Sequence, residues 1–165
     1  MLKKLLVLLA VVTVLGACSS GTKTGASDDS LFQLEDLDGK TVNLADYEGK
    51  NVYVKFWASW CPICLAGLEE VNALATEDTD FEVLTVVAPG YNNEKKKDAF
   101  VKWYKGVENV QDLPVLMDEG GDLVKEFEVR GYPTSAFINK KGELVTTQAG
   151  QLSNDQIKDM MDQLN

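Results

Sequence analysis

The sequence has no histidine, and only three of its 165 residues are cysteine. Cys61 and Cys64 are close in sequence, but two thiolates are only half of the ligands that a four-coordinate zinc site needs. Basic residues are also few, 16 against 26 acidic residues, so the formal net charge is −10. A chain of this charge is a poor candidate for binding nucleic acid or an anionic bilayer through its surface. We therefore expect neither a metal site nor a nucleic-acid partner.

Long apolar runs are missing too, apart from Leu5–Leu15 near the N-terminus. This run is too short for a comfortable permanent membrane span, and with two lysines before it the segment matches a signal peptide. Leu15-Gly16-Ala17-Cys18 then resembles the lipobox of bacterial lipoproteins. We predict a signal peptide over residues 1–17 and a lipid on Cys18 that anchors the protein outside the cytoplasmic membrane. The alternative is an ordinary signal peptide that happens to end near a cysteine.

The remaining chain divides into a tether and one domain. Residues 19–30 (SSGTKTGASDDS) contain no apolar residue larger than alanine, which is typical of a flexible linker. With the lipidated Cys18 they make up a predicted segment 18–30. From residue 31 to residue 165 the sequence is dense in apolar residues and indicates a single globular domain.

Strands and helices alternate along this domain. Alternating apolar residues on both sides of Asp38-Gly39 predict a β-hairpin. The apolar patterns then predict strands over 51–57, 81–88, 134–138 and 144–148, and a short extended segment over 113–117. Helices are expected from near Cys61, around 100–107, around 123–127 and after the capping box at 153–156. The pattern predicts an α/β fold in which a central mixed sheet is flanked by helices.

The segment Cys61-Pro62-Ile63-Cys64 lies between a predicted strand and a predicted helix, a context in which CxxC indicates redox chemistry. At a helix start, free backbone N–H groups and the helix dipole favour a thiolate on the first cysteine. We expect Cys61 to be exposed and to attack or be attacked, and Cys64 to be shielded and to resolve the mixed disulfide. An inert structural disulfide and a peroxidatic cysteine are the alternatives.

Two motifs identify a family. The segment 56–64 (FWASWCPIC) and Gly131-Tyr132-Pro133-Thr134 resemble the thioredoxin superfamily. The hairpin, the segment 47–50 (YEGK) and the lipoprotein signal resemble its TlpA/ResA branch of membrane-tethered proteins. The resemblance implies a thioredoxin-like three-layer sandwich without a cofactor other than the disulfide.

The resemblance also implies the roles of residues around the disulfide. Pro133 is expected in a cis peptide, with the Tyr132–Pro133 turn presenting backbone groups to the substrate's chain. Trp60, Pro62 and Ile63 are expected to contact the substrate beside Cys61. For Trp57, packing in the core is at least as good an interpretation as a redox role.

The sequence departs from its relatives at two positions. Thioredoxin has a buried acid where this chain has Lys55, and the TlpA/ResA branch often has a glutamate where this chain has Gly67. The usual proton acceptors for the second cysteine are therefore missing. Glu69, Glu70 or a water could replace them, but those two acids are better explained as a solvated helix face. The basic run Lys95-Lys96-Lys97 is interpreted in the same way, as a solvated helix start.

Our leading hypothesis is an extracytoplasmic thiol–disulfide reductase that acts as a monomer. Pro62 and Ile63 add no charge beside the thiolate, which favours a weak oxidant. The resemblance implies a membrane thiol transporter of the CcdA/DsbD type as electron donor, and apocytochrome c or a surface methionine sulfoxide reductase as client. The alternatives are a dithiol oxidase for exported proteins and a lipid-anchored binding or chaperone module with a structural disulfide.

Overall fold

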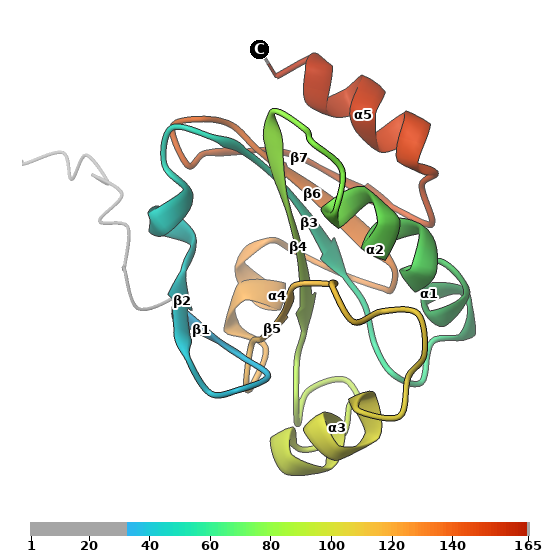
Figure 1. Cartoon of the computed structure of the whole chain (residues 1–165). Helices are drawn as coiled ribbons and strands as arrows, with labels where there is room; N and C mark the ends of the chain where they lie inside the picture. The colour runs from blue at the N-terminus through green and yellow to red at the C-terminus, as the bar shows by residue number, and fades with distance from the viewer. Residues whose placement is uncertain (1–32, 165) are drawn as a thin grey trace, which may run out of the picture.

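The computed structural model describes residues 33–164, and these form a seven-stranded sheet with helices on both faces (Figure 1). The predicted signal peptide, Cys18 and the tether lie outside the described residues. The strand order is β2-β1-β5-β4-β3-β6-β7. The strands are β1 Gln33–Asp36, β2 Thr41–Asn43, β3 Asn51–Phe56, β4 Phe81–Val87, β5 Val115–Met117, β6 Thr134–Ile138 and β7 Leu144–Ala149. The predicted mixed sheet and N-terminal hairpin are confirmed.

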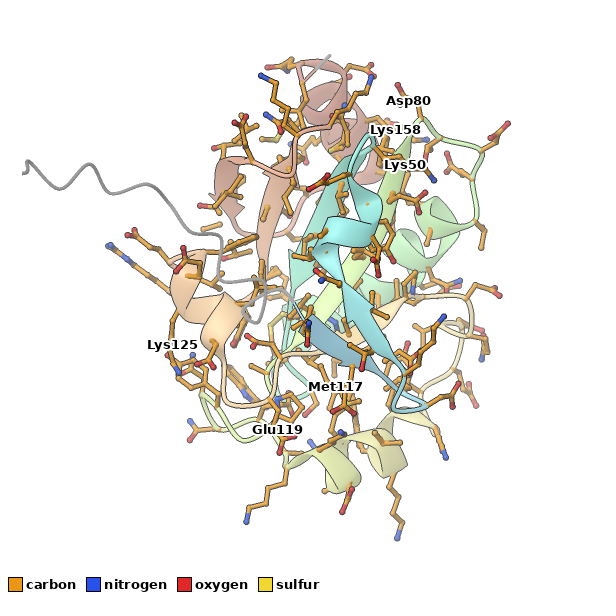
Figure 2. The ribbon with its side chains drawn as sticks, turned by 90° about the vertical axis from the view of Figure 1, so that its left-hand side faces the viewer. Lys50, Asp80, Met117, Glu119, Lys125 and Lys158 are labelled. Carbon is orange, nitrogen blue, oxygen red and sulfur yellow. A yellow bond between two sulfur atoms is a disulfide. The ribbon has the colours of Figure 1, made fainter. Side chains whose placement is uncertain are left out.

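Parallel pairing at the centre of the sheet places the ends of β3, β4 and β5 side by side. The hairpin β1–β2 joins the sheet through antiparallel pairing of β1 with β5, and its turn uses Gly39 at φ 82°. Figure 2 shows Lys50 and Asp80, which precede β3 and β4, at one end of the sheet. Met117 and Glu119, at and after the end of β5, lie at the other end. The segment that carries Cys61 follows β3, so it leaves the sheet at the Met117 end.

The helices agree with the sequence patterns, with one correction. The elements are η1 Leu44–Tyr47, α1 Pro62–Ala66, α2 Leu68–Ala75, α3 Lys97–Tyr104, α4 Asp122–Glu126 and α5 Asn154–Asp162. The single helix expected from near Cys61 is broken at Gly67, whose φ of −101° and ψ of 3° separate α1 from α2. Glycine has a low helix propensity, so the helix breaks at the residue that stabilises helical backbone least. The capping box predicted at the start of α5 is confirmed.

Alternation along β3 divides the core into two parts. Tyr53 and Trp57 point to a cluster that includes both cysteines and residues of α2, α3 and α5, here called the disulfide-side core. Val54 and Phe56 point to a second cluster with α4. Figure 1 shows α2 and α5 on one side of the sheet and α4 on the other. Lys55 lies between Tyr53 and Trp57 in the alternation, so its side chain leaves the sheet on the disulfide side.

Candidate active site

Cys61 and Cys64 form a disulfide at the start of α1, with their Cα atoms 5.2 Å apart. Cys61 is the N-cap of α1, and its Sγ accepts the Cys64 backbone N–H at 3.3 Å. Pro62 occupies the first turn of α1. Backbone N–H groups in that turn have no acceptor within the helix, so proline costs no hydrogen bond there. The helix start therefore presents a free N–H to Cys61 Sγ, as the sequence predicts.

The exposure of the two cysteines corrects one prediction. Cys61 is 3% exposed in the disulfide and Cys64 is fully buried, so the expectation of an exposed Cys61 is wrong for this state. The exposed groups are its neighbours: Trp60 is 48% exposed and Ile63 is 55% exposed. These two apolar residues flank the cysteine in the chain, one before it and one after it. A partner that reaches Cys61 must therefore contact an apolar rim.

Tyr132 and Pro133 lie beside the disulfide although about 70 residues separate them from it in the chain. The Tyr132–Pro133 peptide bond is cis, as the resemblance implied. The Tyr132 carbonyl oxygen is 3.6 Å from Cys61 Sγ, and the Tyr132 ring meets the Trp60 ring edge-on at 5.8 Å between centroids. The structure thus brings together all the residues predicted for the site within the described chain: Trp60, Cys61, Pro62, Ile63, Cys64, Tyr132 and Pro133.

Trp57 belongs to the core. It is fully buried, and its ring packs against Phe100, Trp103 and Tyr104 at centroid distances of 5.8, 6.4 and 6.1 Å. This aromatic cluster ties α3 to the end of β3. Trp57 therefore packs beneath the segment that leads to Cys61. Core packing alone explains the presence of this tryptophan.

A buried carboxylate beside the site was missed by the sequence analysis. Glu94 is 6% exposed and accepts two hydrogen bonds from Ser59, from its N–H at 2.5 Å and from its Oγ at 2.6 Å. Lys95 Nζ donates to the same Ser59 Oγ at 2.6 Å and lies 4.8 Å from the centroid of the Trp103 ring. The interpretation of Lys95 as part of a solvated helix start is therefore wrong.

The loop that carries Glu94 also reaches the other half of the site. Asn92 hydrogen-bonds the Tyr132 side chain, and this bond partly offsets the burial that raises the pKa of Tyr132. One loop after β4 thus holds both Ser59, two residues before Cys61, and Tyr132, next to Pro133. The sequence gives no sign of this role, because a short polar loop with one glutamate is ordinary.

Lys55 is a buried cation in the disulfide-side core. It is 1% exposed, and its Nζ donates a 2.7 Å hydrogen bond to Gln151 Oε1. Burial lowers the pKa of Lys55 to about 8, and the field of Glu70 acts in the opposite direction. Glu69 and Glu70 are both exposed on α2, so the interpretation as a solvated face holds for Glu69, whereas Glu70 Oε1 also accepts the Asn154 N–H at 3.0 Å at the start of α5.

The site lies at the protein surface, where Trp60 and Ile63 are exposed. A cavity of about 340 Å³ lies elsewhere, between η1 and the β6–β7 turn, and none of the predicted site residues lines it. Within residues 33–164, no group of three or more His, Cys, Asp or Glu side chains gathers in a way that could hold a metal ion. The same residues include no helix that is long and apolar enough to cross a membrane.

Comparisons with known proteins agree with this geometry. The profile of the Redoxin family matches residues 22–164. The chain is 31% identical to the thiol-disulfide oxidoreductase ResA of Bacillus subtilis, over 95% of this chain and 87% of that protein. It is 43% identical to an uncharacterised protein of Haemophilus influenzae, over 92% of this chain and 95% of that protein. The solved structure of the exposed lipoprotein thioredoxin Etrx1 from Streptococcus pneumoniae is 48% identical, with a TM-score of 0.77 over 81% of this chain and 98% of that chain.

Proposed function

This chain belongs to the Redoxin family and is a thiol–disulfide oxidoreductase, and from that premise we propose that it is an extracytoplasmic reductase of oxidised exported proteins. The observation that carries this proposal is a shielded disulfide inside an exposed apolar rim, formed by Trp60 and Ile63. A protein client can cover such a rim, whereas a small molecule would need an enclosing pocket.

The two cysteines take different roles in this proposal. In the reduced protein the Cys61 thiolate attacks a client disulfide, forms a mixed disulfide and releases one client thiolate. Cys64 then attacks Cys61 Sγ, which closes the Cys61–Cys64 disulfide and releases the second client thiolate. The client contacts Trp60, Pro62 and Ile63 on one side. On the other side, the Tyr132–Pro133 turn positions its backbone.

The direction of electron flow follows from the charge beside the thiolate. A strong oxidant stabilises its reduced thiolate heavily, commonly through a nearby cation. Pro62 and Ile63 bring no charge, and the ammonium of Lys95 is bound to Ser59 and stacked on Trp103. These features favour the reductase over the dithiol oxidase, which is the second candidate within the same fold.

Donor and clients complete the proposed pathway. A membrane thiol transporter of the CcdA/DsbD type reduces the Cys61–Cys64 disulfide. Electrons then pass to oxidised exported proteins such as apocytochrome c or a surface methionine sulfoxide reductase. The protein acts as a monomer and needs no cofactor besides its own disulfide.

A lipid on Cys18 holds the protein at the outer side of the membrane. The lipobox-like sequence supports this location, and so does the similarity to a protein described as an exposed lipoprotein thioredoxin. Mass spectrometry of the membrane-extracted protein tests it. We expect a mature chain that begins at an acylated Cys18, whereas a chain with another N-terminus, released freely from cells, would end the lipoprotein proposal.

The redox state of the pair in living cells tests the reductase itself. Cells are quenched with acid, and free thiols are then labelled with a maleimide of high mass and separated on a gel. We expect a mostly reduced pair that becomes oxidised when the donor is removed. A pair that stays oxidised but is reduced by mild thiols would favour the oxidase. A pair that resists mild thiols would favour a binding module with a structural disulfide.

A further inference from the structure

A charged amine in the core, with one neutral hydrogen-bond partner, is an unusual feature of this molecule. None of the ion pairs within residues 33–164 includes Lys55, and its amine donates a hydrogen bond to the Gln151 carboxamide. An ammonium ion buried in this way loses its hydration, and the charge of Glu70 compensates this loss only in part, because burial remains the larger effect on the Lys55 pKa. A hydrophobic side chain of the same length would cost less, so stability does not explain this lysine.

The position of Lys55 in the sheet places it on the same face as the disulfide. Its neighbours in the β3 alternation, Tyr53 and Trp57, both belong to the core cluster that contains Cys61 and Cys64. Its partners across the sheet are Thr85 and Ser135, whose hydroxyls bond to other groups, Pro114 O and Tyr53 Oη. The Lys55 amine therefore lies between the sheet and the helices α1 and α2, without a bond to either neighbouring strand in the described chain.

Gln151 connects the amine to the end of α1. Its carboxamide lies so close to Gly67 that a Cβ built there would be 2.5 Å from Gln151 Nε2. The Gly67 N–H in turn donates to the Cys64 carbonyl oxygen at 3.1 Å. Lys55 Nζ thus lies one glutamine side chain away from the turn that carries Cys64. The groups that act on the amine are the Gln151 carboxamide, through its hydrogen bond, and Glu70 on α2, through its charge.

We propose that the neutral amine of Lys55 accepts the proton of the Cys64 thiol, directly or through one water, when Cys64 resolves a mixed disulfide. The Cys64 thiolate then attacks Cys61 Sγ, a new S–S bond forms, and the bond from Cys61 to the client sulfur breaks. The electron pair leaves with the client as a thiolate, and the Lys55 ammonium afterwards returns its proton to solvent. In the oxidase direction the same step runs in reverse: a client thiolate attacks Cys61 Sγ, Cys64 leaves as a thiolate, and the Lys55 ammonium gives it a proton.

Titration of the amine supports the role. Because burial lowers the pKa of Lys55 to about 8, about a tenth of the amine is neutral near pH 7. Cys64 is fully buried, so its thiol cannot readily lose its proton to bulk water. A nearby base whose pKa is close to the working pH is well matched to accept that proton.

The test separates the two chemical steps with Ellman's reagent. Reduced protein is mixed with an equimolar amount of the reagent, and release of 2-nitro-5-thiobenzoate is followed by stopped-flow absorbance. The first phase reports attack by Cys61, and the second reports attack of Cys64 on Cys61 Sγ. In K55M we expect the second phase to slow at least tenfold at pH 7, with the first phase within about twofold of the wild type. The wild-type second phase should also show an inflection near pH 8 that K55M lacks.

Two further variants make the outcome decisive. K55R keeps a positive charge but cannot release its proton, so its second phase should be as slow as that of K55M. K50M removes an exposed lysine just before the same strand, and both of its phases should match the wild type. Thermal melting by circular dichroism establishes that each variant is folded. An unchanged second phase in K55M, or a wild-type rate in K55R, would overturn the assignment of Lys55 as proton acceptor.

Discussion

Gln151 occupies the space that a side chain at position 67 would need: a Cβ on Gly67 would lie 2.5 Å from Gln151 Nε2 and 2.8 Å from its Oε1. The same carboxamide accepts the hydrogen bond of Lys55 at 2.7 Å. The absence of a side chain at Gly67 therefore leaves room for Gln151. Within the described chain, Gln151 is the only side chain seen to hydrogen-bond Lys55. The break in the helix and the environment of Lys55 are one structural feature.

A double-mutant cycle tests this relationship. In G67A the new methyl group must displace Gln151, so we expect a loss of about 1 kcal/mol or more in the free energy of unfolding. Because φ at this position is negative, alanine can adopt the native backbone, and replacing glycine there stabilises a protein by about 0.4–1 kcal/mol through the unfolded chain. In the Q151A background G67A should therefore be neutral or stabilising. Equal effects of G67A in both backgrounds, measured by urea unfolding, would show that the two residues do not interact.

The proposed roles of the cysteines predict opposite trapping behaviour. Replacing Cys64 with alanine removes the resolving thiol, so C64A should accumulate mixed disulfides through Cys61. C61A should neither trap partners nor turn over a disulfide substrate. Non-reducing gels and mass spectrometry of the trapped species measure both outcomes. If C61A captured partners and C64A did not, the nucleophile would have to be Cys64.

The carboxylate of Glu94 should stabilise the segment before Cys61. E94Q replaces an acceptor of two Ser59 hydrogen bonds with an amide that can satisfy only part of them, and the site is buried. We expect the free energy of unfolding to fall by about 1–3 kcal/mol. E128Q is the matched control, because the Glu128 side chain is 79% exposed. Denaturation midpoints that agree between E94Q and E128Q would rule out this anchoring role.

The buried lysine predicts a pH dependence of stability with a definite sign. The pKa of Lys55 is about 8 in the folded protein and 10.5 as an ordinary lysine, so between these values the unfolded chain binds more protons. The Lys55 contribution to the stability of the folded wild type therefore rises with pH through this window, by about 2–3 kcal/mol between pH 7 and pH 10.

The variant K55M isolates this effect, because all other titrating groups are shared with the wild type. We expect K55M to be more stable than the wild type at pH 7, and the difference to shrink by most of that amount at pH 10. Urea unfolding of both proteins at the two pH values gives the difference. A gap that stays constant across this range would mean that the amine does not titrate there.

Most of the fold could be predicted from local patterns. Alternation and β-branched residues identified strands such as 134–138, whose bounds agree with β6 Thr134–Ile138. The break at Gly67 was missed because the apolar spacing continues through it: Leu68, Val71 and Leu74 all face the core on the far side of the break. Helical periodicity predicts which residues are buried, but it does not predict where a helix is interrupted.

The site was predictable where residues close in sequence carry the chemistry. Cys61 and Cys64 were found from their spacing, and Tyr132 and Pro133 from a family motif. Glu94 and Gln151 were not found, because their contacts with Ser59 and Lys55 join segments 35 and 96 residues apart. The exposure of Cys61 was misjudged for a similar reason, since the side chains around it, Trp60 and Tyr132, come from separate segments.

The reduction potential of the Cys61–Cys64 pair tests the reductase proposal most directly. It is obtained by equilibrating the protein against glutathione buffers and measuring the reduced fraction after acid quenching. With no charge on Pro62 or Ile63, we expect a value nearer the thioredoxin potential of about −270 mV than the potential of about −120 mV of strong oxidants. That span corresponds to roughly 7 kcal/mol, more than a helix terminus supplies at up to about 2 kcal/mol. A measured potential of about −150 mV or higher would contradict the reductase and establish the oxidase in its place.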